Sequence, residues 1–232
     1  MNTQSRAGYL DAMGIQRWVL RTTQSGPSAA VVDPATSSTE AGDSARQWDS
    51  LEAEVAGCTR CVLHKTRSRT VFGTGDRRAE WMIIGEAPGA DEDRQGEPFV
   101  GRAGQLLNEV LLAAGFRREQ VYIANILKCR PPGNRNPLPQ EIASCRSYLE
   151  RQIRLVQPGI ILAVGGIAAN SLLQTDARVG ELRGRLHHLG EVPVVVTYHP
   201  AYLLRSPLEK RKVWQDLQFA RRVYRDALAH RA

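Results

Sequence analysis

The sequence predicts an α/β protein with three layers, α/β/α, built around a central and mostly parallel sheet of four strands. Two observations carry this prediction. Segments with helical patterning separate the strands, so successive strands cross over and both faces of the sheet are covered. The other observation is a set of four short apolar runs with the composition of buried strands, Glu80–Gly85, Val121–Ile126, Ile160–Val164 and Val192–Thr197.

The helices are predicted from apolar spacing and from stop signals. In the predicted helix Ala103–Gly115, for example, apolar residues recur at helical spacing at Leu106, Leu107, Val110 and Leu111, and Gly115 provides a C-terminal stop. The predicted helices are Trp48–Val55, Ala103–Gly115, Gln140–Val156, the segment after Gly165-Gly166 as far as Leu173, and Leu208–Ala229.

Residues 1–44 differ in composition from the rest and are predicted to be a flexible extension. The stretch Thr22–Ala45 is rich in Ser, Thr, Ala, Gly and Pro, and it has too few large apolar residues to offset its chain entropy. A short amphipathic segment at residues 9–21 precedes it. This segment either docks on a partner or folds back onto the domain. The folded domain is predicted to span residues 45–232.

The bulk composition is that of a globular protein with a basic surface. The chain has 232 residues, 31 Lys and Arg against 24 Asp and Glu, and a net charge of +7. No apolar run approaches the roughly 20 residues of a membrane span, so we expect no membrane association. Because Arg greatly outnumbers Lys, the charge is compatible with phosphate contacts and a polyanionic partner, although moderate basicity is common.

Four cysteines form a pattern with metal-site character. Cys58 and Cys61 make a C-x-x-C pair, Cys129 follows a predicted strand, and Cys145 lies on a predicted helix. Four thiolates can hold either Zn²⁺ or an iron–sulfur cluster, and their spacing does not separate the two. Two disulfides are the alternative. No secretory signal precedes the cysteines, so we expect a cytoplasmic protein with reduced thiols.

Polar residues follow three of the predicted strands where those strands end. The first strand runs into a Gly/Pro loop with an acidic run, Gly85–Asp93; the second ends at Asn125; the fourth runs into Tyr198–Arg205, which contains His199. Taken alone, each of these features more commonly has a structural role than a ligand-binding or catalytic one. Because parallel strands present their carboxyl ends at one edge, we expect these groups to share one cleft.

These motifs, in order along the chain, resemble those of the iron–sulfur uracil-DNA glycosylases, family 4 of that superfamily. The resemblance covers about residues 45–229, includes the four-cysteine arrangement, and leaves residues 1–44 unexplained. It rests on Gly85-Glu86-Ala87-Pro88-Gly89, Glu97-Pro98-Phe99-Val100-Gly101-Arg102-Ala103-Gly104, Asn125, Cys129-Arg130-Pro131-Pro132 and His199-Pro200.

The resemblance implies an enzyme that flips deoxyuridine out of DNA and cuts its N-glycosidic bond, leaving an abasic site for base excision repair. His199 would then donate to uracil O2 as negative charge develops there. Asn125 offers a donor and an acceptor that match the O4 and N3–H edge of uracil and mismatch cytosine. By resemblance, Phe99 would stack on the base and Glu92 would exclude the 5-methyl group of thymine.

Water activation is the role with the weakest sequence signal. Some relatives carry Asp or Asn where this chain has Ala87, so no carboxylate acts from that position. Glu86 is the nearest candidate, and backbone groups around Ala87 can contribute.

The resemblance also implies a [4Fe–4S] cluster held by Cys58, Cys61, Cys129 and Cys145, with a mainly structural role. For contacts to DNA we expect Arg130 in the basic loop near Asn125 and Arg205 after the His-Pro motif. Leu203 is the expected wedge that fills the gap left by the flipped base, with Leu204 as the alternative.

Two rival functions belong to the same superfamily. A covalently trapping uracil-DNA-binding protein would need a nucleophilic histidine in an inserted basic loop, and no histidine lies between Glu86 and Asn125. A non-catalytic DNA-binding module would not need Glu86, Phe99, Asn125 and His199 together. Residues 13–21 also resemble the amino-terminal peptide of the psi subunit of bacterial DNA polymerase III, which docks on the clamp loader. This implies a bacterial, nucleoid-associated protein, and nothing indicates more than a monomer.

Overall fold

The structure is a computed structural model that describes residues 35–229, with side chains from residue 43 onward. The predicted docking segment, residues 9–21, therefore lies outside the described residues. The chain divides into two units, Met1–Thr39 and Glu40–Ala232, and the second contains the whole sheet.

The first described helix, α2 (Ala35–Ala56), begins well before the predicted start at Trp48. Residues 35–44, which we expected in the flexible extension, are therefore helical. The later turns bury Trp48, Leu51 and Val55 against the domain. Once these turns are formed, each further residue adds to an existing helix without a new nucleation cost, so the stretch before them continues the helix although it is rich in Ser and Thr.

The sheet has six strands, and the prediction of four was incomplete. Its order is β1-β3-β2-β4-β6-β5. The four predicted strands form the parallel centre, and they are β3 (Tyr122–Asn125), β2 (Trp81–Gly85), β4 (Ile160–Val164) and β6 (Val192–Thr197). The other two, β1 (Thr74–Gly75) and β5 (Leu186–Leu189), pair antiparallel at the edges. Neither edge strand is an apolar run, because β1 has only two residues and β5 is half-exposed.

The register of the parallel strands brings their carboxyl ends together. Gly85, the last residue of β2, pairs with Asn125, the last residue of β3. Further along the same sheet, Val164 at the end of β4 pairs with Thr197 at the end of β6. The loops that follow these strands therefore leave from one edge, as expected for a ligand site in an open α/β sheet.

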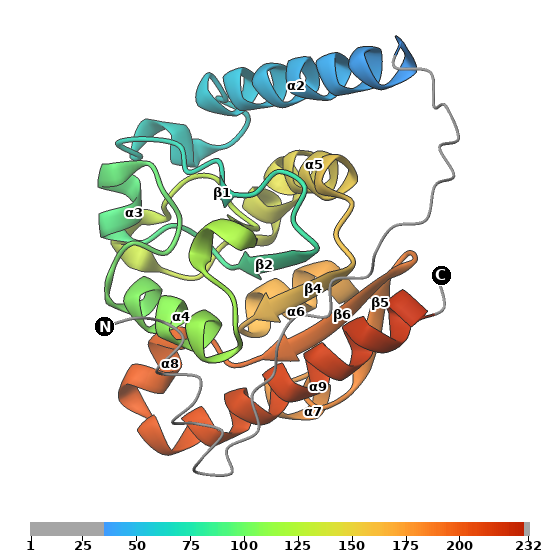
Figure 1. Ribbon diagram of the computed structural model, residues 1–232. Helices are drawn as coiled ribbons and strands as arrows, with labels where there is room; N and C mark the ends of the chain where they lie inside the picture. Colours follow the sequence, from blue (N-terminus) through green and yellow to red (C-terminus); the bar gives the residue numbers. More distant parts are fainter. Residues whose placement is uncertain (1–34, 230–232) are drawn as a thin grey trace, which may run out of the picture. The chain divides into compact units, whose positions relative to one another are not determined.

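Helices cover both faces of the sheet, which confirms the three-layer fold (Figure 1). Alternate strand residues point to opposite faces. Met82 and Ile84 join the core under α2, α5 (Pro139–Val156) and α6 (Gly166–Leu173). Trp81 and Ile83 join the core under the other three covering helices, α4 (Arg102–Ala113), α8 (Pro200–Arg205) and α9 (Lys210–Ala229).

The helix ends follow local backbone chemistry. Gly115 has a φ of +86° directly after the last turn of α4, which confirms the predicted stop. The last helix begins at Lys210 rather than Leu208, because residues 207–209 form a 3₁₀ turn. Among the described helices, none has both the length and the apolar character of a membrane span. The remaining short elements are η1 (Val62–Lys65), α3 (Ala90–Gln95), η2 (Arg118–Gln120), η3 (Pro132–Asn134), α7 (Val179–Leu182) and η4 (Pro207–Glu209).

Candidate active site

A pocket of about 460 Å³ opens at the carboxyl ends of the central strands. Loops that are far apart in the sequence build it: the loop after β2, the segment before α4, the loop after β3, and the start of α8. All six residues predicted for catalysis or substrate binding line this one pocket, and they are Glu86, Ala87, Glu92, Phe99, Asn125 and His199.

The absence of a side chain at Gly85 allows this assembly. A Cβ atom there would lie 2.5 Å from Oδ1 of Asn125 and 2.6 Å from Cζ of Phe99. Both distances are far below a normal carbon contact, so any larger residue would push the two side chains apart. The last residue of β2 therefore has to be glycine for the amide and the ring to meet over the strand end.

Asn125 presents an unused hydrogen-bonding group to the pocket. Its side chain is 2 % exposed, and its Oδ1 has no hydrogen-bond partner among the described residues. Its backbone is held firmly, because Nζ of Lys128 donates to the Asn125 carbonyl at 2.9 Å and to Oε1 of Gln152 at 2.6 Å. Since buried polar atoms are nearly always paired, an orphaned amide oxygen in a pocket indicates a ligand that donates to it.

Phe99 is held in a backbone conformation that is uncommon for a bulky residue, with a φ of +54°. Its ring lies 5.6 Å from the His199 ring, at an angle of 31° between the planes. Arg118 clamps the segment by donating to the Phe99 carbonyl at 3.3 Å and to Oδ1 of Asn108 at 3.1 Å. A lone arginine outside any motif gives no sequence signal, so Arg118 was not predicted.

The Glu92 carboxylate ties two loops together through backbone groups. Oε2 accepts a hydrogen bond from the Gly89 N–H at 3.0 Å, and Oε1 accepts from the N–H groups of Val100 and Gly101 at 2.9 Å each. Glu92 lines the pocket as predicted. Its hydrogen bonds give it a clear positioning function, because they fix the loop after β2 against the segment that carries Phe99.

His199 is oriented by its own helix. It is the N-cap of α8, and its Nδ1 accepts a hydrogen bond from the Ala201 N–H at 3.1 Å. A ring nitrogen that accepts carries no proton, so in the neutral ring the proton is on Nε2. Burial, assisted by the nearby Arg205 guanidinium, lowers the pKa of His199 to about 4, against the weaker opposite effect of Glu92. His199 is therefore a neutral hydrogen-bond donor at pH 7.

Glu86 and Asn134 are two further polar residues that line the pocket. Burial raises the pKa of the Glu86 carboxyl above its ordinary value. Asn134 was not predicted; it has a φ of +55°, and its Oδ1 accepts from Nε of Arg130 at 2.7 Å. Arg130, predicted to contact DNA, thus stands on the loop beside the pocket and orients one of its lining residues.

The two leucines considered for the wedge differ in their exposure to solvent. Leu203 is 1 % exposed and packs in the core between the sheet and α9, so it cannot enter DNA without leaving that core. Burial therefore favours the alternative, Leu204, as the wedge. Leu204 is 39 % exposed, and its neighbour Arg205 lines the pocket.

The four cysteines line one small cavity of about 10 Å³. All four are free thiols, which rules out the two-disulfide alternative in this structure. Cys129 accepts a hydrogen bond at Sγ from Nη1 of Arg67 at 3.1 Å, and the Lys128 backbone N–H hydrogen-bonds to the Cys145 side chain. In the part of the chain that the structure describes, no group of three or more His, Cys, Asp or Glu is arranged to hold a single metal ion.

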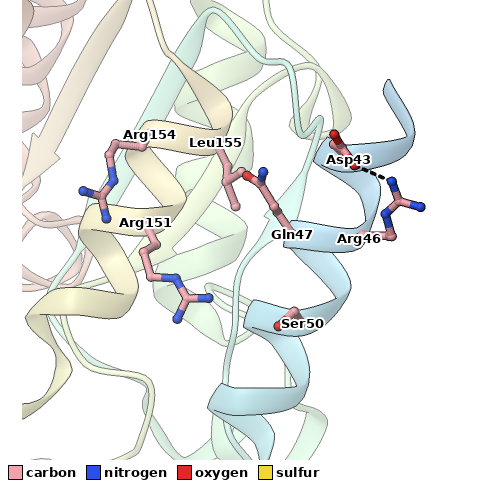
Figure 2. Close-up of a pocket in the computed structure, with 7 residues that line it drawn as sticks. All are labelled: Asp43, Arg46, Gln47, Ser50, Arg151, Arg154 and Leu155. Atoms are coloured by element: carbon pink, nitrogen blue, oxygen red, sulfur yellow. Dashed lines mark hydrogen bonds and ion pairs between the residues drawn. The ribbon is translucent and has the colours of Figure 1, made fainter. Parts of the chain in front are cut away.

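A second hollow lies between α2 and α5 and has a volume of about 580 Å³ (Figure 2). Figure 2 shows side chains from the two helices facing across it, and the Arg46 guanidinium turned to Asp43 on its own helix. Arg151 likewise pairs with Glu54. The hollow contains none of the strand-end residues, and its paired charges indicate a solvated surface groove rather than a reaction site.

Comparison with known proteins agrees with the geometry. A family model described as "Uracil DNA glycosylase superfamily" matches residues 72–218. A type-4 uracil-DNA glycosylase of Archaeoglobus fulgidus is 40 % identical over 178 residues, which cover 73 % of this chain and 89 % of that protein. Type-4 enzymes of Thermotoga maritima and Pyrobaculum aerophilum are 42 % and 43 % identical, over 74 % and 72 % of this chain and 91 % and 89 % of theirs. The chain therefore belongs to the uracil-DNA glycosylase superfamily, as a member of its type-4 family.

Proposed function

We propose that this protein removes uracil from DNA by hydrolysing its N-glycosidic bond and leaves an abasic site. The observation that carries the proposal is the unpartnered Oδ1 of Asn125, buried in a pocket that also contains a neutral histidine. A pyrimidine in a duplex is hidden by stacking, so the nucleotide has to be extruded into the pocket before its glycosidic bond is accessible.

Asn125 reads the base. Its free Oδ1 accepts from N3–H of uracil, and its amide N–H₂ donates to O4. Cytosine has an unprotonated N3 and an amino group at C4, so it would set acceptor against acceptor and donor against donor. In a buried pocket the unpaired groups are costly, which makes this pattern an effective basis for selectivity. Phe99 provides the stacking surface, held by Arg118 and kept close to Asn125 by Gly85.

His199 stabilises the leaving group. As the bond between C1′ and N1 breaks, negative charge develops on uracil and positive charge on the sugar. Nε2–H of His199 donates to O2 of the leaving uracil, and a fixed neutral donor is sufficient for this role. Water then adds to C1′. We assign its alignment to the Glu86 carboxylate, with Asn134 as the second polar group and the backbone around Ala87 as a minor contributor.

We also propose that the four cysteines hold a [4Fe–4S] cluster. The support is a donor set of four thiols around one cavity. Burial raises the pKa of Cys129 to about 11 and raises that of Cys145, and the hydrogen bonds from Arg67 and from the Lys128 backbone act in the opposite direction. Cys58 and Cys61 after the end of α2, Cys129 in the loop after β3 and Cys145 on α5 would hold such a cluster, which would supply electron-transfer chemistry when bound. Iron and sulfide analysis with visible absorption tests this, and a colourless protein with stoichiometric zinc would contradict it.

The DNA partner is expected to contact the pocket rim. We assign phosphate contacts to Arg130 and Arg205, and the wedge to the exposed Leu204. The amino-terminal segment, residues 9–21, is proposed to dock on a bacterial clamp loader, and we also propose that the enzyme is monomeric, cytoplasmic and nucleoid-associated. A peptide of residues 1–21 should bind the clamp loader, and unchanged binding after Trp18→Ala would count against this.

The decisive experiment is excision from a defined substrate. The purified protein is incubated with an oligonucleotide containing a single uracil, and alkali then cleaves the abasic product. We expect a strand break at the uracil position and none with cytosine or thymine there. Binding without a break would indicate a non-catalytic module, and an adduct stable in SDS would indicate covalent trapping; either result contradicts the proposal.

A further inference from the structure

Two tyrosines beside the pocket have no role in the chemistry described above. Tyr202 lines the pocket and is 36 % exposed, although it lies within the short helix that His199 caps. Its ring centroid is 5.1 Å from that of Tyr198, with 38° between the ring planes. Tyr198 immediately precedes His199, so the residues on both sides of the histidine contribute to one aromatic pair at the rim of the pocket.

Two basic side chains lie close to this pair of tyrosines. Cζ of Arg183 lies 5.7 Å and Nζ of Lys212 lies 6.0 Å from the centroid of the Tyr198 ring. The Lys212 side chain is 46 % exposed, and its Nζ pairs with the Glu209 carboxylate at 2.8 Å, so a phosphate there would share or replace this partner. Exposed aromatic faces beside a basic group are the combination by which proteins hold unpaired nucleic-acid strands.

The pair rests on a buried network that fixes its position. Asp216 of α9 is 1 % exposed, and its carboxylate accepts from Oγ1 of Thr197 at 2.8 Å and from Nη2 of Arg183 at 2.9 Å. Nη2 of Arg183 also donates to the Lys212 carbonyl at 2.8 Å. The end of β6, the start of α9 and the loop after α7 are thereby locked together directly beneath Tyr198.

We propose that Tyr202, backed by Tyr198, is a stacking platform for the nucleobase next to the flipped uridine, and that Lys212 contacts the adjoining phosphate. The proposal rests on the function proposed above and extends it to a neighbouring nucleotide. Extrusion of one nucleotide removes a stacking partner from each of its neighbours. An aromatic face at the pocket rim replaces the lost partner for one of them, and it does so for any base sequence because every base has a π face.

The test places a fluorescent base at the platform. Oligonucleotides carry a non-hydrolysable 2′-fluoro-2′-deoxyuridine with 2-aminopurine on its 5′ side or on its 3′ side. We expect wild-type protein to quench the emission at one of these two positions, because stacking on an aromatic ring quenches 2-aminopurine. Tyr202→Ala should abolish the quenching and weaken binding roughly 5- to 150-fold, the range of one lost base–aromatic stack.

Four further variants sharpen the result. Tyr202→Phe should retain both quenching and affinity, because it keeps the ring, whereas Tyr202→Leu keeps apolar packing at the site and should lose both. Trp214→Ala is the matched control: Trp214 is 43 % exposed on α9 but does not line the pocket, and its loss should change neither. Lys212→Ala should reduce the slope of log K against log salt by about one phosphate contact.

The outcomes separate this proposal from the proposed function. Quenching that is the same in wild type, Tyr202→Ala and Tyr202→Leu overturns the platform, as does loss of quenching in Tyr202→Phe. Wild-type protein that releases uracil while neither 2-aminopurine position responds overturns the platform alone. Wild-type protein that releases no uracil from the ordinary substrate contradicts the proposed function.

Discussion

Replacing Asn125 by alanine should separate the stability of this protein from its activity. Most buried polar residues are paired, so their removal lowers both. Asn125 differs, because it is 2 % exposed and its Oδ1 has no partner among the described residues. No protein group among the described residues therefore pairs with this oxygen, and the bound base is its proposed partner.

The expected changes in the free energy of unfolding and in kcat/KM both follow from this arrangement. An unsatisfied buried polar group costs about 1–3 kcal/mol, so its removal offsets the loss of packing, and the free energy of unfolding should be unchanged or higher. The substrate complex loses two hydrogen bonds to the base edge, each worth about 0.5–1.5 kcal/mol. Their sum of about 1–3 kcal/mol corresponds to a fall of roughly 5- to 150-fold in kcat/KM for uracil.

Urea unfolding and single-turnover excision measure the two effects on the same preparation. Asn136→Ala is a suitable control, because Asn136 is exposed and outside the pocket, and it should change neither quantity. A loss of stability in Asn125→Ala as large as its loss of activity would refute the reasoning, because it would show that the amide is already paired in the free enzyme.

Other measurements test the histidine, the wedge and the cysteine site. His199 has a pKa of about 4 when folded and an ordinary value near 6.5 when unfolded, so the unfolded chain takes up the proton first and stability should fall as pH drops from about 6.5 to 4. His199→Gln should remove this part of the pH dependence; an identical dependence in both proteins would contradict it. Leu203→Ala should cost about 2–5 kcal/mol of stability, whereas Leu204→Ala should leave stability unchanged and slow excision from duplex DNA; equal melting temperatures would refute this assignment. If the four cysteines hold the proposed [4Fe–4S] cluster, Arg67→Met should lower its reduction potential, measured by voltammetry, because a hydrogen bond to Cys129 Sγ is lost; an unchanged potential would exclude this role.

Much of the site could be predicted because its residues stand directly after strands with strong local signals. β4 and β6 have the predicted bounds, β2 begins one residue later than predicted, and β3 is one residue shorter at each end. The edge strands β1 and β5 were missed, because their pairing depends on neighbours in space rather than on their own composition. Arg118 and Asn134 were missed for a related reason, since each lies in a short 3₁₀ turn without a recognisable sequence pattern.

The sequence by itself determined the alternation of strands and helices, the cysteine spacing, and the strand-end positions of Asn125 and His199. These properties depend on residues that are near one another along the chain, where apolar spacing and turn residues act directly. Only the tertiary structure decided that Leu203 is buried and Leu204 exposed, and that the Asn125 amide oxygen has no partner. Both facts depend on which atoms from distant segments occupy the surrounding space, and contacts of that kind have no local signature in the sequence.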